Sequence, residues 1–259
     1  EIDAVLILTP HHNHSDLVIK ALNKGKAVYV EKPLALDMQS ITDIEESIYR
    51  SENPKLFIGF NRRFSKSAQF IKQKLINNPA NSINLRFSVP PLDSDHWTNI
   101  KEIGGGRIVG EAVHGIDLAC YLFDSLPQSI SASAPIDKTN NMAKDNQVFL
   151  NINFANGSHA SLQYFSEANQ ILSKERIEVH GEGNSYILED FKMLRFLEGS
   201  QDRSKTFSSG KGHKESLSIF FDYVRDKSQN PFTWEEIKAV SKAAIIAQDH
   251  INSGQQHNV

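Results

Sequence analysis

The stretch Ala27-Val28-Tyr29-Val30-Glu31-Lys32-Pro33 decides the fold class, because an apolar run there ends in an acid, a lysine and a proline. An earlier apolar run, Ala4–Leu8, ends in Thr9-Pro10. Between the two, Ser15–Lys24 has apolar residues at helical spacing, and Gly25 follows as a helix stop. This order predicts two parallel strands joined by a helix. Ligands bind such sheets just beyond the carboxyl ends of the strands.

A third predicted strand, Lys55–Phe60, completes a parallel α/β unit, and the pattern then changes. Asp93–Gly106 is typical of a polar, glycine-rich loop, and Gln201–Gly212 is expected to be a second loop. Alternating apolar residues and turn signals in the second half predict a largely antiparallel sheet with helices on one face. The predicted strands are Ile83–Val89, Ser129–Ser133, Asn146–Phe154, His159–Phe165, Glu175–His180, Ser185–Glu189 and Leu194–Leu197, and the predicted helices are Ser65–Ile76, Val109–Phe123, His213–Lys227 and Trp234–Ile251.

The composition is that of an ordinary globular protein, with 259 residues, a net charge of -3 and a pI of about 6.4. No strong basic field exists to bind nucleic acid or an anionic membrane. The single cysteine, Cys120, excludes an internal disulfide. No apolar run is long enough to span a bilayer and no signal peptide opens the sequence, so we expect a cytoplasmic protein. Because the sequence enters a buried strand directly after Glu1, we also expect part of the sheet to lie upstream.

Four groups of residues are candidates for chemistry. The loop Thr9–His14 holds three histidines, which indicate either a metal site or, as we favour from their spacing, a polar loop that lines a ligand crevice. Lys32 is held stiffly before Pro33 and is either a functional group or a surface lysine. Arg62 and Arg63 follow the third strand and can bind hydroxyls, carboxylates or phosphates, or form salt bridges at a domain junction.

The fourth group lies on the predicted helix after Gly104–Gly106. Glu111, His114 and Asp117 are spaced i, i+3 and i+6, which places them on one slanting stripe among apolar residues. Asp117 could orient the imidazole of His114 for proton transfer. The alternative is a core histidine whose hydrogen bonds Asp117 satisfies.

The order of these motifs resembles the glucose–fructose oxidoreductase, inositol dehydrogenase and rhizopine-catabolism family, often written Gfo/Idh/MocA. The matching motifs are T-P-x-x-x-H at Thr9, E-K-P at Glu31, G-F-N-R-R-F at Gly59, and W…G-G-G…H-x-x-D from Trp97 to Asp117. The resemblance implies the C-terminal part of a Rossmann-type parallel sheet in residues 1–60. It implies an α+β substrate and oligomerisation domain with a large, mainly antiparallel open sheet in residues 61–259.

By this resemblance, the protein is an NAD- or NADP-dependent oxidoreductase that acts on a hydroxyl or keto carbon of a sugar, inositol or nucleotide sugar. It implies that Lys32, His114 and Glu111 are catalytic. It also implies a homo-oligomer formed through the open sheet. The spacing of the histidines in Thr9–His14 argues against a bound metal. The implied cofactor-binding residues are Thr9, Pro10, Asn13, His14, Glu31 and Lys32, and the implied substrate-binding residues are Arg62, Arg63, Trp97 and Asp117.

Two departures from the family pattern qualify this interpretation. The family commonly has an aspartate four residues before the histidine, where this chain has Gly110. Glu111 is next to it, but about 100° further around a helix. The family's G-x-G-x-x-G loop is also missing from the sequence, so we expect this fragment to bind NAD(H) poorly. A non-catalytic binding or assembly module therefore stays open as an alternative.

Overall fold

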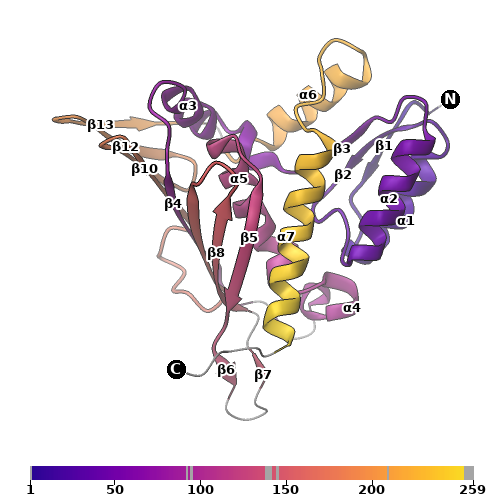
Figure 1. Ribbon diagram of the computed structural model, residues 1–259, viewed down its shortest axis with the longest axis horizontal. Coiled ribbons are helices and arrows are strands. Elements are labelled where there is room, and N and C mark those ends of the chain that lie inside the picture. The colour runs from indigo at the N-terminus through magenta and orange to yellow at the C-terminus, as the bar shows by residue number, and fades with distance from the viewer. Residues whose placement is uncertain are drawn as a thin grey trace.

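The computed structural model describes residues 2–91, 93, 96–137, 142–143, 146–208 and 210–253. A small parallel sheet opens the chain, in the order β1-β2-β3. Its strands are β1 (Ala4–Ile7), β2 (Ala27–Val30) and β3 (Leu56–Ile58), and they are joined by α1 (His14–Leu22) and α2 (Met38–Arg50) (Figure 1). The Asp37 side chain caps α2 by accepting a 2.7 Å hydrogen bond from the Ser40 backbone N–H.

A second, larger sheet follows in the order β13-β12-β11-β10-β4-β9-β8-β5, and only its β4–β9 pair is parallel. These two sheets confirm the predicted α/β fold class. A two-stranded hairpin, β6 (Ile136–Asp137) and β7 (Met142–Ala143), stands apart. The eight strands are β4 (Ser82–Ser88), β5 (Pro127–Ser133), β8 (Gln147–Phe154), β9 (His159–Phe165), β10 (Glu175–Gly181), β11 (Asn184–Glu189), β12 (Met193–Glu198) and β13 (Gln201–Thr206).

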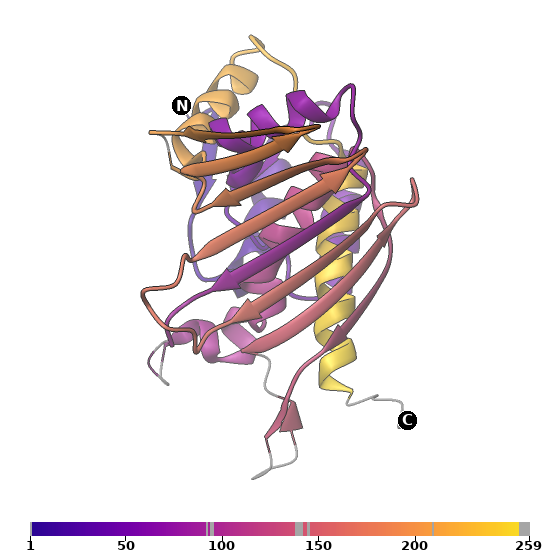
Figure 2. The ribbon, with the colours of Figure 1, turned by 90° about the vertical axis from the view of Figure 1, so that its left-hand side faces the viewer.

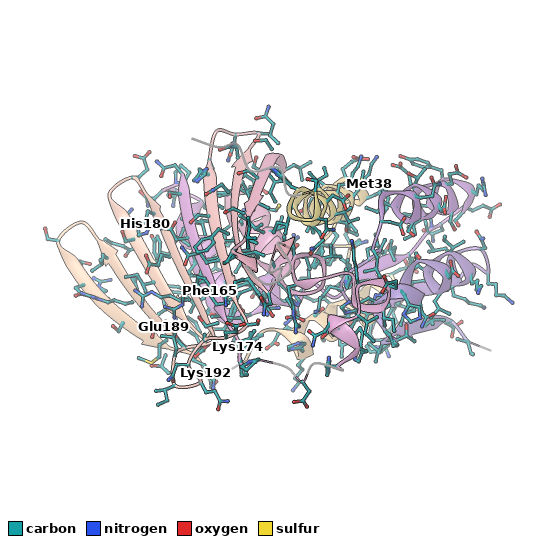
Figure 3. All side chains as sticks on the ribbon, turned by 90° about the horizontal axis from the view of Figure 1, so that it is seen from below. Met38, Phe165, Lys174, His180, Glu189 and Lys192 are labelled. Atoms are coloured by element: carbon teal, nitrogen blue, oxygen red, sulfur yellow. The ribbon has the colours of Figure 1, made fainter. Side chains whose placement is uncertain are left out.

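One face of the large sheet is packed and the other is open. Alternate residues along β8 are buried, as expected for a sheet with one covered face. The helices α3 (Lys66–Leu75), α5 (Val113–Phe123) and α7 (Trp234–Asn252) lie behind the sheet in Figure 2. Seen from below, side chains fill the space between sheet and helices (Figure 3).

The two sheets are joined through helix contacts. At the amino end of α7, the Glu45 carboxylate of α2 accepts hydrogen bonds from Trp234 Nε1 at 2.8 Å and Lys238 Nζ at 2.6 Å. The helix α6 (His213–Val224) places Phe220 against Tyr29 and Phe57 of the parallel sheet. The division of the chain at residue 60 stays a prediction. No helix in the described part of the chain is long and apolar enough to cross a membrane.

Three sequence predictions need correction. Gln201–Thr206 is the edge strand β13 rather than a loop, and its six side chains are all exposed, so it carried no alternating apolar signal. The expected loop Asp93–Gly106 contains η3 (Trp97–Asn99) and α4 (Lys101–Gly104), although residues 92, 94 and 95 lie outside the described part. The helix expected from Val109 begins as a π-helical turn, η4 (Ile108–Ala112).

Candidate active site

The carboxyl ends of the parallel strands carry the first part of the site. Lys32 follows β2, and its bond to Pro33 is cis. Glu31 lies against Gly59 beyond β3, where an added Cβ would be 2.8 Å from Glu31 Oε2. A side chain at position 59 would therefore displace this carboxylate.

His14 joins the two strand-end loops. It is fully buried, with Nδ1 2.7 Å from the Pro33 carbonyl oxygen and Nε2 2.9 Å from that of Thr9. Both ring nitrogens are thus occupied inside the protein, so the expected direct contact of His14 with a cofactor does not fit this geometry. Thr9 and Pro10 are exposed and Asn13 is half-buried.

The second part of the site is the π-helical turn. Lys32 Nζ donates hydrogen bonds to Glu111 Oε1 at 2.8 Å and to the Gly110 carbonyl oxygen at 2.5 Å. A π turn has i→i+5 hydrogen bonds and a different angular spacing from an α-helix. The expectation that Glu111 is turned away from the family's aspartate position assumed an α-helix, whereas the π turn lets its carboxylate meet Lys32.

Gly110 is fitted to its neighbour His11. A Cβ added at Gly110 would lie 3.2 Å from His11 Cε1, which is a tight contact. His11 is itself held by a 2.8 Å hydrogen bond between Nδ1 and the Gly104 carbonyl oxygen, and by an edge contact with the Trp97 ring at 4.7 Å. Burial lowers the pKa of His11 to about 4, so it is neutral at pH 7.

His114 is a buried imidazole with an unsatisfied nitrogen. Its Nδ1 is inaccessible to solvent and has no hydrogen-bond partner among the described residues. Burial lowers the pKa of His114 well below 6.5, and the nearby charges of Arg62 and Lys32 lower it further. An unpaired buried polar atom costs about 1–3 kcal/mol, and such exceptions in native structures often have a catalytic reason.

Asp117 does not orient His114 as the sequence suggested. Its carboxylate instead accepts two hydrogen bonds from Arg63, Nη2 to Oδ1 at 2.5 Å and Nε to Oδ2 at 3.2 Å. The two side chains are 4% and 1% exposed, and Glu236 Oε1 lies 3.4 Å from Arg63 Nη1. Arg63 rather than His114 binds this carboxylate, because a guanidinium is charged and holds its N–H donors in a fixed forked geometry. Arg63 and Asp117 therefore form a closed ion pair rather than a substrate contact.

Arg62 belongs to a different group, which sequence reasoning did not find. Glu175, at the start of β10, accepts from Arg62 Nε at 2.7 Å and Nη2 at 2.9 Å, and also from Lys211 Nζ. Burial tends to raise the pKa of Glu175, but the two cations outweigh it and lower the pKa. Lys211 is a quarter exposed and also acts electrostatically on His114, so this group borders the site.

Gly212 lets the Lys211 loop approach the arginine segment η2 (Asn61–Phe64). Its φ is +85°, and an added Cβ would lie 2.4 Å from the Asn61 carbonyl oxygen. Asn61 Nδ2 in turn donates to the Lys211 carbonyl oxygen at 2.8 Å. Within the described residues, no three histidine, cysteine or acidic side chains converge as a metal-binding group.

Comparison with known proteins gives the same family for both parts of the chain. The NAD-binding Rossmann fold of the GFO/IDH/MocA oxidoreductase family matches residues 1–60, and the GFO/IDH/MocA C-terminal domain matches residues 78–187. An inositol 2-dehydrogenase from Rhizobium meliloti (strain 1021) is 28% identical over 237 residues, which cover 80% of this chain and 69% of that protein. A scyllo-inositol 2-dehydrogenase (NAD(+)) from Bacillus subtilis (strain 168) is 30% identical over 138 residues, covering 52% of this chain and 39% of that protein.

A solved structure shows the same fold. The UDP-N-acetylglucosamine 3-dehydrogenase from Acidithiobacillus ferrooxidans superposes with a TM-score of 0.84 at 17% identity, covering 99% of this chain and 80% of that chain. At this identity the likeness concerns the fold alone. Together with the two family matches, it leads to one conclusion: the chain belongs to the Gfo/Idh/MocA family of oxidoreductases, whose first domain is an NAD-binding Rossmann fold.

Proposed function

We propose that this protein is an NAD- or NADP-dependent dehydrogenase that interconverts a CH–OH group and a carbonyl on an inositol, sugar or nucleotide sugar. The observation that carries the proposal is the convergence of Lys32, from the parallel sheet, with Glu111 and His114, from the π turn and α5. The relatives named inositol 2-dehydrogenases support the substrate class.

The strand-end loops have the chemistry expected for the cofactor. Thr9, Pro10 and Asn13 are accessible at the edge where Lys32 stands, and Glu31 lies half-buried beside them. Open α/β sheets bind nucleotides at this edge. When bound, the nicotinamide ring exchanges a hydride with the substrate carbon. In this proposal His14 supports the site indirectly, by joining the Thr9 and Pro33 loops.

Lys32 and His114 have different roles at the substrate hydroxyl, as hydrogen-bond donor and as proton acceptor. An ammonium group has three N–H donors. Lys32 donates to Glu111 and Gly110, and no other described residue accepts its third N–H, which can serve the substrate oxygen. The neutral imidazole of His114 can accept the hydroxyl proton as the O–H bond breaks. Glu111 is ionised, because Lys32 lowers its pKa although burial alone would raise it. It therefore fixes the position of the lysine.

Three further roles remain proposals. Arg62, from η2, and Lys211, from the loop before α6, flank the reacting centre, and Trp97 borders it from η3. We also propose a homo-oligomer formed through the open sheet face, where the Phe149 and Phe165 rings lie 5.5 Å apart.

Turnover by the full-length protein tests the proposal. Reduction of NAD+ and of NADP+ would be followed at 340 nm with myo-inositol, scyllo-inositol, glucose, UDP-N-acetylglucosamine and, as an acyclic control, ethanol. We expect turnover with at least one cyclic polyol and none with ethanol. Tight cofactor binding without turnover of any cyclic substrate would favour the non-catalytic alternative.

A further inference from the structure

A small polar pocket, whose lining residues differ from those of the Lys32–Glu111–His114 cluster, includes Lys101 of α4. Its volume is about 260 Å³, smaller than the roughly 300–1,000 Å³ of pockets for drug-sized ligands. It shares no lining residue with that cluster. It is lined by Pro91, Thr98, Asn99, Lys101, Gly106, Arg107, Asn146 and Ser166.

Arg107 places a buried positive charge in this wall. The residue is 7% exposed, and its guanidinium donates to Asn99 Oδ1 from Nη2 at 2.6 Å and to Thr98 Oγ1 from Nη1 at 3.4 Å. Both partners are neutral, and Arg107 forms no ion pair within the described part of the chain. Arg62 and Arg63, which are equally buried, each have a carboxylate. Because a guanidinium carries five donors in a fixed fork, Arg107 retains donors for an anion.

The other lining residues extend this chemistry. Lys101 is exposed and adds a second positive charge to the pocket. Asn146 donates from Nδ2 to Glu167 Oε1 at 3.3 Å, while its own Oδ1 is buried and receives no hydrogen bond from any described residue. Glu167 is exposed and is not among the residues that line the pocket. The pocket wall thus combines the Arg107 guanidinium, which has no carboxylate partner among the described residues, with the Asn146 Oδ1 acceptor, which receives no hydrogen bond from them.

We propose that this pocket binds a small oxyanion with a neighbouring hydroxyl group, such as a hydroxycarboxylate or a phosphate monoester. Arg107 would hold two oxygens of the anion in a forked contact, and Lys101 would add attraction at the mouth. The hydroxyl would donate toward Asn146 Oδ1. The proposal concerns binding only and does not depend on the dehydrogenase assignment.

Isothermal titration calorimetry on the full-length protein tests this site directly. The probes are inorganic phosphate, D-glycerate and, as an uncharged control, glycerol. We expect saturable binding of one or both anions and none of glycerol, and the two anions distinguish phosphate from carboxylate recognition. In ¹⁵N-labelled protein, the same titration should shift the Gly106 amide resonance.

Variants locate the binding. Arg107→Gln should weaken anion binding about tenfold or more, because a charge-assisted hydrogen bond is lost. Lys101→Ala, at an exposed position, should weaken anion binding by about threefold. This second variant keeps the proposal testable if Arg107→Gln does not fold. Arg195→Gln, which changes an exposed arginine of β12, serves as the control and should bind like the parent. Absence of saturable anion binding, or binding that neither pocket variant weakens, would overturn the proposal.

Discussion

Two polar clusters of this molecule differ in burial and in how completely their polar atoms are paired. In the Arg63–Asp117 pair, both carboxylate oxygens receive hydrogen bonds from one guanidinium, and the side chains are 4% and 1% exposed. In the Lys32–Glu111–His114 cluster, described residues accept only two of the three ammonium N–H groups of Lys32, and His114 Nδ1 has no described partner. The difference separates a group that stabilises the fold from a group that is ready to contact a ligand.

This contrast also explains two adjacent arginines that the sequence does not distinguish. Arg63 lies inside the closed pair, whereas Arg62 shares Glu175 with Lys211 beside the site. Buried ion pairs contribute little net stability, yet removing one partner is costly. Substitutions in the closed pair should therefore change stability, while substitutions in the open cluster should change catalysis.

The largest expected effect is on turnover in His114→Ala. Loss of the proton acceptor should lower kcat/KM by about 100- to 10,000-fold, the usual contribution of general acid–base catalysis. The melting temperature should fall by less than expected for a large-to-small core substitution, because the cost of the cavity is partly offset by removal of a buried, unsatisfied nitrogen. His180→Ala, on the large sheet, is the matched control and should keep parental kinetics. Parental kcat/KM in the folded His114→Ala protein, measured well below its melting temperature, would make His114 a structural residue.

Asp117→Asn should destabilise the protein instead. Leaving Arg63 without its main carboxylate should lower the free energy of unfolding by about 3 kcal/mol or more, measured by urea denaturation. The control is Asp202→Asn, which breaks the exposed pair with Arg195 and should cost less than about 1 kcal/mol. Equal losses in the two variants would contradict the distinction between a buried and an exposed pair.

Acid should destabilise the fold through His11. Its folded pKa of about 4 lies below its ordinary value of 6.5, so the unfolded chain binds more protons in that interval and stability falls as pH falls through it. Between pH 7 and pH 5 the free energy of unfolding should fall by about 2 kcal/mol through this group. His11→Gln should remove most of that difference in urea denaturation at the two pH values. An unchanged pH dependence would show that His11 is protonated in the folded protein.

Glu111→Gln should have the smallest effect. The amide oxygen can still accept from Lys32, but the negative charge that fixes the ammonium is lost. We expect kcat/KM to fall about tenfold, the size of one charge-assisted contact, with an unchanged melting temperature. Glu102→Gln, at a solvent-facing position on α4, is the control. Parental activity in Glu111→Gln would assign no role to this carboxylate.

Sequence reasoning predicted the parts that depend on local order. The run Ala27–Val30 is a buried strand, as expected, and Lys32 lies just beyond its carboxyl end. His114 also lies next to that lysine's partners. The strand prediction holds because strand direction fixes where the lysine lies, whereas the catalytic roles of Lys32 and His114 stay predictions.

The features of the site that the sequence did not predict depend on contacts between segments that are distant in the sequence. Nothing near Asp117 in sequence shows that Arg63 will take its carboxylate, 54 residues away. Glu175 and Lys211 meet across 36 residues and belong to no motif. The sequence did not predict the π turn at Ile108–Ala112, because its apolar spacing was interpreted with the period of an α-helix.

The most direct test of the central claim is the kinetics of Lys32→Ala in the full-length protein. NAD(P)H formation with the preferred substrate would be measured together with cofactor affinity and the melting temperature, and Lys24→Ala, at an exposed position after α1, is the control. We expect a loss of about 100-fold or more in kcat/KM, with a smaller loss of stability than in Asp117→Asn because Glu111 is a third exposed. Turnover within about threefold of the parent would contradict the assignment of Lys32 to the reacting hydroxyl.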